Sequence, residues 1–353
     1  MDFALTAEQD ELAALTRQIL ADLVDEPRLW AELAKAGVLA AALPESLGGA
    51  GLGLLEQCSV LIEIGRAVAP VPYLASIVLG ASALAAFGSE HQRQQAAEAG
   101  RGELILAAAL AEDEDPRLPG TAARAIDGGW QLTGIKTAVL AGAVADLLLV
   151  PASTSAGTAV FLVSPADQGV LVQPQQVTGG ADTALVELAG AVVPAERLLG
   201  DTASGPDITG WLVDHGTAGL CALQLGVAER ALELTAAYAR SREQFGKPIG
   251  SFQAVSQRLA DGYIDVEAMR LTLWQAAWRL ASGLPAKSEI ATAKFWAAEG
   301  GHRIAHTAVH VHGGVGIDMD GDVHRYFAAA MHNEFALGGA TAQLRRIGEW
   351  LAG

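Results

Sequence analysis

The sequence predicts a mostly α-helical protein with a central β domain. Near both ends of the chain, apolar residues recur at intervals of three and four, which is the spacing of amphipathic helices. Between these regions the pattern changes to short runs of alternating or β-branched residues, which favour strands. We therefore expect an N-terminal helical domain over residues 1–103, a middle β-barrel or sandwich over 104–203, and a C-terminal four-helix bundle over 204–353.

The N-terminal helical pattern begins at Thr6, which forms a candidate capping box with Gln9. Pro27 is expected to open a second helix, because proline is favoured in the first helical turn. Two more helices are predicted over residues 55–68 and 72–87.

The middle region contains five predicted strands, over residues 130–133, 145–150, 158–163, 170–173 and 184–188. After Pro206 the helical spacing returns, and helices are predicted over residues 208–242, 251–281, 288–310 and 326–351. Ser251 is the expected N-cap of the second of these helices. The chain thus runs from helices to strands and back to helices.

The composition argues against nucleic-acid binding, a membrane span and a cysteine-based metal site. The net charge of −17 opposes any general role in nucleic-acid binding, because a polyanion would be repelled. The chain contains no run of eighteen uncharged apolar residues, so we predict no membrane span. Cys58 and Cys221 lie far apart and outside any metal-binding spacing, which predicts neither a disulfide framework nor a zinc site. We expect a cytoplasmic location.

The stretch from Tyr238 to Gln253 joins a basic helix end to an exposed turn. Arg242 falls in the last turn of the predicted helix, and its planar fork of donors suits a pyrophosphate. Phe245 precedes a Gly-Lys-Pro turn and could cover a purine ring. The alternative reading is a capped helix end with solvated charges.

A second glycine-rich segment follows the predicted helix that ends at His310. Gly313 and Gly314 would let backbone amides approach a phosphate, because no Cβ stands in the way. The alternative is that no ligand binds here and the same glycines only end the helix.

Both segments resemble signatures of the acyl-CoA dehydrogenase family. So do the Pro-Glu-x-x-Gly-Gly loop that begins at Pro44 and the segment from Val186 to Gly200. The resemblance covers nearly the whole chain and implies FAD as cofactor and an acyl-CoA thioester as substrate. It also implies that a set of residues holds the ADP half of a neighbouring subunit's FAD, and these are Arg242, Phe245, Gln253, His310, Gly313 and Gly314.

The same resemblance indicates that this chain lacks a catalytic base. Family members remove the substrate α-proton with a glutamate at one of two positions, and the matching positions here are Gly339 and Gly216. Where relatives place a Trp-Ile-Thr segment against the flavin ring, this chain has Ala138 to Leu140. Four consecutive carboxylates from Glu112 to Asp115 would also oppose the negative charge of a reduced flavin. We therefore assign no catalytic residue.

Other ionisable groups leave alternatives open. Asp214 or His215 could act as a non-standard base, which would make the chain a self-sufficient flavoenzyme. A further alternative is a scaffold subunit without flavin. His302, His306 and His310 share one helix face, but a polar face or subunit contact is favoured over a metal site. Asp318, Asp320 and Asp322 lack the closing glutamate of a calcium loop.

These observations favour one reading. The chain resembles the short β-type subunits of the heteromeric (α2β2) acyl-CoA dehydrogenases with which actinobacteria oxidise steroid side-chain thioesters. The resemblance implies a catalytic α-type partner subunit that supplies the base and the flavin-ring contacts. Small residues at positions 138, 216 and 338–340 suggest that the missing active site leaves room for a bulky ring system.

Overall fold

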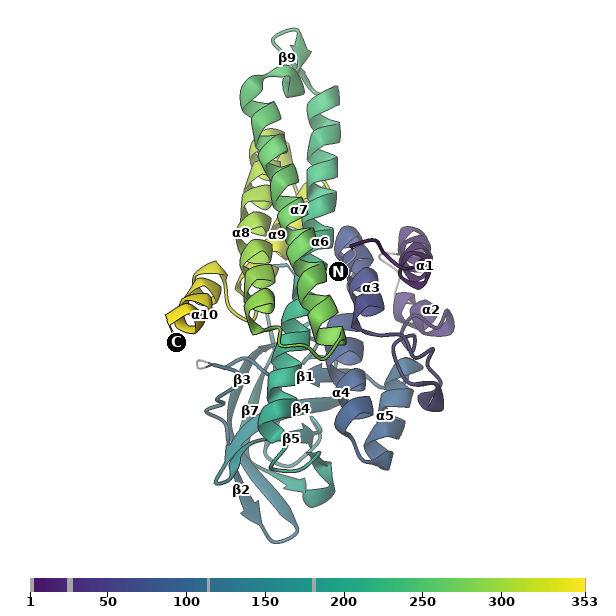
Figure 1. Cartoon of the computed structure of the whole chain (residues 1–353), viewed down its shortest axis with the longest axis vertical. Coiled ribbons are helices and arrows are strands. Elements are labelled where there is room, and N and C mark those ends of the chain that lie inside the picture. The colour runs from purple at the N-terminus through teal and green to yellow at the C-terminus, as the bar shows by residue number, and fades with distance from the viewer. Residues whose placement is uncertain (1–2, 24–27, 113–114, 180–181, 353) are drawn as a thin grey trace.

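The structure is a computed structural model that describes residues 3–23, 28–112, 115–179 and 182–352. The molecule is elongated, with long C-terminal helices at one end and a β sheet at the other (Figure 1). Short N-terminal helices pack along one side of the junction. The predicted architecture of helical regions around a central β domain is confirmed.

The N-terminal helices are α1 (Ala7–Leu23), α2 (Leu29–Lys35), α3 (Leu54–Ala67), the π-helix η2 (Tyr73–Ala81), α4 (Ser82–Phe87) and α5 (Glu90–Gly100), with a 3-10 turn η1 (Glu45–Leu47). The predicted capping box is present, because the Thr6 amide donates to Gln9 Oε1 at 2.8 Å and the Gln9 amide donates to Thr6 Oγ1 at 3.2 Å. The predicted helix start at Pro27 lies outside the described residues. Helix α5 was not predicted as a separate element.

The strands form one eight-stranded sheet in the order β6-β7-β3-β2-β4-β5-β8, with β1 parallel to β4. They are β1 (Leu106–Ala108), β2 (Ala122–Ile126), β3 (Gly129–Val139), β4 (Leu147–Thr154), β5 (Gly157–Val163), β6 (Val170–Gln175), β7 (Thr183–Pro194) and β8 (Leu198–Leu199). All five predicted strands are present. The unpredicted β1 and β8 are too short to show an alternating pattern, and β2, with the sequence Ala-Ala-Arg-Ala-Ile, has few β-branched or aromatic residues.

The C-terminal helices are α6 (Gly205–Ser241), α7 (Gln253–Ala281), α8 (Lys287–His312), α9 (Val323–Phe335) and α10 (Ala340–Ala352). The single helix predicted over residues 326–351 is wrong. Leu337 and Gly338 adopt positive φ values of 57° and 95°, and this left-handed backbone separates α9 from α10. The predicted N-cap is also wrong, since the Ser251 hydroxyl donates to the Pro248 carbonyl instead. Among the described residues, no helix is both long and apolar enough to cross a bilayer.

Helices α3 and α6 touch through their backbones. A Cβ added to Gly65 would lie 2.1 Å from the carbonyl oxygen of Leu223, and one added to Gly226 would lie 2.0 Å from that of Ile62. Each helix therefore presents a glycine where the other helix presents a carbonyl. A side chain at either position would force the helices apart.

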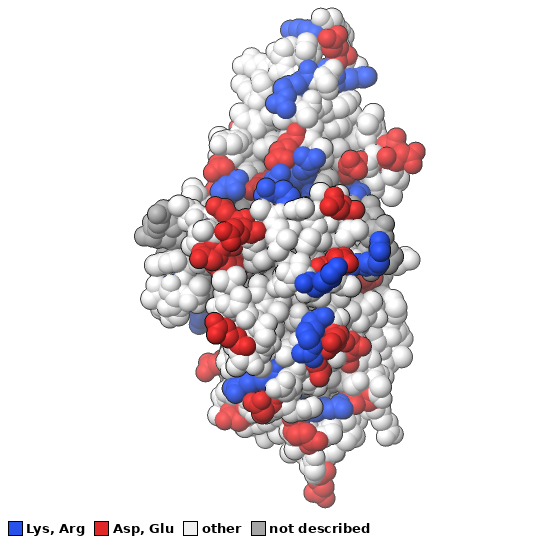
Figure 2. Space-filling model, turned by 90° about the vertical axis from the view of Figure 1, so that its right-hand side faces the viewer, with Lys and Arg blue, Asp and Glu red and all other residues white. Residues whose placement is uncertain are grey.

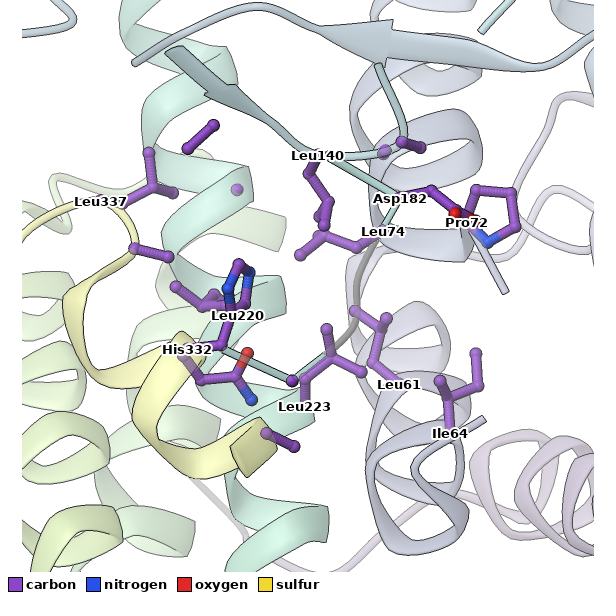
Figure 3. Close-up of a pocket in the computed structure, with 18 of the residues that line it drawn as sticks. Leu61, Ile64, Pro72, Leu74, Leu140, Asp182, Leu220, Leu223, His332 and Leu337 are labelled. Carbon is purple, nitrogen blue, oxygen red and sulfur yellow. The ribbon is translucent and has the colours of Figure 1, made fainter. Parts of the chain in front are cut away.

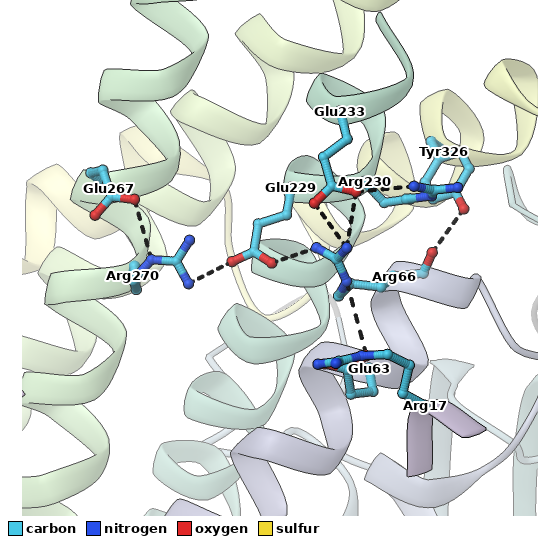
Figure 4. Close-up of polar contacts among 9 residues, drawn as sticks. All are labelled: Arg17, Glu63, Arg66, Glu229, Arg230, Glu233, Glu267, Arg270 and Tyr326. Atoms are coloured by element: carbon cyan, nitrogen blue, oxygen red, sulfur yellow. Dashed lines mark hydrogen bonds and ion pairs between the residues drawn. The ribbon is translucent and has the colours of Figure 1, made fainter. Parts of the chain in front are cut away.

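A cluster of ion pairs joins the same two helices beside this backbone contact (Figure 4). Arg66 of α3 donates to Glu229 and Glu233 of α6 at 2.8 Å each, and its carbonyl accepts from the Tyr326 hydroxyl of α9 at 2.7 Å. Glu229 also pairs with Arg270 of α7 at 2.8 Å. The cluster thereby links α3, α6, α7 and α9 and holds them side by side.

We expect Gly65→Ala to destabilise the protein by about 3 kcal/mol, because neither backbone can yield to a contact of 2.1 Å. Urea unfolding followed by circular dichroism measures the change. Gly210→Ala in α6 is the matched control, since no atom lies within 4 Å of its added Cβ. The control should be neutral or stabilising by up to about 1 kcal/mol. Equal losses in both variants would contradict the close-contact explanation.

Candidate functional site

The end of the bundle furthest from the sheet carries a small hairpin between α6 and α7. Its strands are β9 (Glu243–Gln244) and β10 (Lys247–Pro248). Phe245 and Gly246 form the turn with φ values of 54° and 76°. The Phe245 side chain is 90% exposed. A large aromatic ring thus stands in solvent on a left-handed turn that favours asparagine or glycine.

Arg242 and Gln253 flank this hairpin, and both are exposed. Arg242 ends α6, where its amide donates to the Tyr238 carbonyl at 2.8 Å, while Gln253 is the first residue of α7. Phe252 supports the turn by edge-to-face contact with Phe245 at 6.1 Å between ring centroids. Lys and Arg side chains gather near this tip in the view of Figure 2, although the chain as a whole is strongly acidic.

The glycine segment after α8 lies at the same end of the bundle. Tyr238 of α6 stacks on His312 of α8 with ring centroids 4.3 Å apart, which brings the two helix ends together. Gly313 has φ 64° and stops the helix, and a Cβ added to Gly313 or Gly314 would meet nothing within 4 Å. His310 is exposed. The structure therefore gathers the six predicted cofactor residues at one tip.

This tip fits a dinucleotide. It offers a guanidinium for a pyrophosphate, an exposed ring for an adenine face, and open glycine backbone for close approach of phosphate oxygens. The residues present thus match the ADP portion of FAD by their chemistry. An isoalloxazine ring would need other contacts.

A separate cavity of about 460 Å³ lies where the helices meet the sheet (Figure 3). Its walls are mainly leucine, valine, alanine and proline side chains from α3, η2, the loop between them, α6, α9 and the C-terminal end of strand β3. Asp182, His332 and Asn333 are the polar side chains among the described residues that line it. The small residues at 138 and 216 suggested such a space, but its full lining could not be predicted, because it comes from segments far apart in the chain.

Glycine occupies both positions at which the family resemblance places a base. Gly216 lies in the cavity wall, where an added Cβ would contact Leu337 and Leu79 at 3.3 Å each. Gly339 lies in the loop that follows α9. Leu337 of the same loop fills the space beside Gly216. The predicted small residues at 138 and 216 do line the cavity, whereas those at 338–340 do not.

Two features expected to face a flavin ring have clear structural partners. Ala138, Val139 and Leu140 line the cavity, and the Ala138 amide donates to Gln175 Oε1 at 2.7 Å. The Glu112 carboxylate forms an ion pair with the fully buried Lys136 and accepts from the Gly120 amide at 2.6 Å. Contrary to the expectation of four free carboxylates, Glu112 is therefore neutralised. Asp113 and Glu114 lie outside the described residues.

Asp214 and His215 do not line the cavity. Asp214 pairs with Arg117 at 2.5 Å, and burial raises its pKa while Arg117 partly offsets that effect. The His215 ring stacks on Trp211 with centroids 3.7 Å apart and donates from Nδ1 to the Trp211 carbonyl at 3.0 Å. Burial lowers the pKa of His215 to about 4. Both groups are thus engaged in packing.

The other titratable clusters also have structural partners. His302 contacts Glu334 at 2.9 Å through Nδ1, and its ring lies 4.3 Å from that of His306. Asp318 Oδ1 accepts from the Asp320 amide within a turn. The described residues contain no group of three or more His, Cys, Asp or Glu side chains arranged to hold a metal.

One buried residue near the cavity escaped the sequence analysis. Lys294 of α8 is fully buried and donates to the carbonyls of Asn333 and Glu334 at 3.0 and 2.9 Å. Burial lowers its pKa to about 8. It therefore anchors the end of α9 next to the loop at Leu337. One feature of the sequence could have indicated this burial: Lys294 lies between Ile290 and Ala297 on the apolar face of the helix.

Comparison with known proteins identifies the family. The model "Acyl-CoA dehydrogenase, N-terminal domain" matches residues 6–99, and "Acyl-CoA dehydrogenase, C-terminal domain" matches residues 203–352. The chain belongs to the acyl-CoA dehydrogenase family. Membership in this family confirms the predicted enzyme class, an oxidoreductase, and its predicted cofactor, FAD.

Individual acyl-CoA dehydrogenases are similar over the full length. Acyl-CoA dehydrogenase FadE27 of Mycobacterium tuberculosis is 51% identical, with 100% of this chain and 99% of the relative covered. One chain of the crystal structure of the ChsE4–ChsE5 complex from the same organism superposes with a TM-score of 0.95 at 50% identity, covering 100% and 99%. A variant of the Tcur3481–Tcur3483 steroid ACAD has a TM-score of 0.92 at 39% identity, covering 98% of both chains.

We expect the burial of neutral His215 to make stability depend on pH. Its folded pKa of about 4 lies below the unfolded value near 6.5, so the unfolded chain binds the proton first as the pH falls. Folding stability should therefore be lost between pH 6.5 and 4, by about 2 kcal/mol after allowance for partial exposure. The wild type and His215→Phe, which keeps the stack on Trp211, are compared by urea unfolding across this range.

The variant should lose less stability than the wild type over the same interval. His91 is exposed on α5, and His91→Phe serves as the control that should follow the wild-type profile. Parallel profiles for the wild type and His215→Phe would show that His215 is not held in its neutral form.

Proposed function

We propose that this chain is a non-catalytic subunit of a heteromeric acyl-CoA dehydrogenase and contributes the ADP-side half of the FAD site to a catalytic α-type partner. The observation that carries this proposal is an asymmetry within one chain. The dinucleotide motif at the tip of the bundle is assembled and exposed, while the two positions of the family's base are glycines, Gly216 in the cavity wall and Gly339 in the loop after α9. A partner subunit accounts for both halves of the pattern.

Each tip residue has a distinct part in holding the nucleotide. The Arg242 guanidinium pairs with the pyrophosphate, and the Phe245 ring covers the adenine, as its 90% exposure permits. The backbone at Gly313 and Gly314 approaches the phosphates without Cβ obstruction. Gln253 and His310 supply hydrogen-bonding groups at the edges of the same surface. No part of this role requires the cavity.

The chemistry itself belongs to the partner. When bound, FAD would supply the acceptor for a hydride from the substrate Cβ, and a carboxylate would be needed to take the α-proton. In this chain Leu337 lies beside Gly216, and neither Gly216 nor Gly339 carries a carboxylate that could take that proton. The α-type subunit therefore supplies the base.

Two relatives support the proposed assembly and substrate. The ChsE4–ChsE5 structure is a complex of two different chains, and the Tcur3481–Tcur3483 enzyme is named as a steroid ACAD. We extend both properties to this protein: a heterotetramer acting in the cytoplasm on an acyl-CoA thioester with a bulky, steroid-type acyl group. The self-sufficient alternative is disfavoured because Asp214 and His215 lie outside the cavity wall.

Co-purification with the partner subunit tests the assembly. The complex should contain about one FAD per pair of different chains, counted by absorbance after denaturation. A yellow protein with one FAD per chain, active on a thioester without a partner, would overturn the proposal. A colourless complex would favour the scaffold alternative.

We expect Arg242→Ala to weaken FAD binding by the complex about tenfold or more, because a charge-assisted hydrogen bond to phosphate is lost. Flavin retention after gel filtration measures the effect, and the elution volume reports assembly, which should be unchanged. Arg124→Ala removes an exposed arginine of β2 and is the matched control. Undiminished flavin in the Arg242→Ala complex would contradict the role assigned to this side chain.

A further inference from the structure

The apolar cavity is large enough to hold a molecule. Its volume of about 460 Å³ falls within the range of small-molecule pockets. Leu220 and Leu223 of α6 face Leu61 and Ile64 of α3 across it, with Leu74 and Leu140 closing another side (Figure 3). Walls of this composition are typical of sites that take apolar ligands. The walls therefore favour a hydrophobic occupant.

One polar group on the wall is unused. His332 of α9 projects into the space among these leucines (Figure 3), and within the described residues its ring has no hydrogen-bond partner. Its neighbour Asn333 is already engaged, because its side-chain amide donates to Gln224 at 3.0 Å. The ring is partly buried, so a ligand that displaces water from it would have to offer a hydrogen bond in return. His332 thus points to a ligand with one hydrogen-bonding group.

The charges around the cavity disfavour an anionic ligand. Burial lowers the pKa of His332, so its ring is neutral and offers no positive charge. The nearest buried ammonium, Lys294, already donates to two carbonyls at the end of α9. Asp182, the carboxylate among the described lining residues, is exposed at the edge of the cavity. A carboxylate head group would meet no compensating cation here.

We propose that this cavity binds a neutral hydrophobic molecule carrying one hydroxyl or carbonyl group, held through His332 and not chemically altered. The inference rests on the proposed function, in which this chain has no working active site of its own. Binding would then fill the cavity between α3, α6 and α9 without any reaction. The occupant is distinguished from the substrate by having neither a thioester nor a charge.

The test uses the assembled complex with 1-dodecanol as the probe and dodecanoate as the charged probe of equal chain length. Native mass spectrometry counts the probe molecules bound per copy of this chain. Because the catalytic partner has an acyl pocket of its own, the informative quantity is the difference between variants of this chain. Leu220→Trp fills the cavity and should remove one bound dodecanol. Leu344→Trp changes a half-exposed leucine of α10 and should remove none.

A more conservative variant keeps the test decisive if Leu220→Trp fails to fold. His332→Phe keeps a ring of similar size and should weaken dodecanol binding about two- to tenfold, the contribution of one net hydrogen bond. Dodecanoate should bind this site at least tenfold more weakly than dodecanol. Equal dodecanol counts in the wild type and Leu220→Trp, or a preference for dodecanoate that Leu220→Trp abolishes, would overturn the proposal. Flavin content of the same samples tests the proposed function independently, since neither variant touches the tip.

Discussion

The direct backbone contact between α3 and α6 is the constraint on which the rest of the structure depends. Gly65 and Gly226 each face a carbonyl of the opposite helix, so the separation of the helices is set by main-chain atoms. Side chains on either side of this contact follow from it. Leu61 and Leu223 face each other across the cavity, and Arg66 reaches Glu229 in the next turn. A small change in helix separation would alter the cavity and the ion pairs together.

Helix α6 connects two regions of opposite character. Its 37 residues span about 55 Å. Near its middle, Gly216 and Leu220 belong to an apolar wall with no base, and at its end Arg242 belongs to an exposed polar surface. One rigid helix thus holds the cavity at a fixed distance from the exposed surface to which we assign the nucleotide. The two can serve different ligands without interfering with each other.

Local features of the sequence predicted well, and features that depend on distant segments did not. The Thr6 and Gln9 cap, the helix stop at Gly313 and the exposed position of Phe245 are each determined within a few residues. The burial of Lys294 and the pairing of Lys136 with Glu112 require packing that no short pattern records. The break at Leu337 was missed although Gly338 and Gly339 follow it, because the helical spacing of apolar residues on both sides was given more weight than this turn signal. Family motifs, rather than periodicity, drew attention to the tip.

The backbone at Phe245 has a consequence for how such chains diverge. A left-handed phenylalanine costs about 1 kcal/mol or more, and asparagine or glycine would adopt the same turn at lower cost. In a lineage that had ceased to bind the nucleotide, drift would favour exchange of the ring for one of these residues. The identity of this single turn residue can therefore separate working subunits from decayed ones among genome sequences.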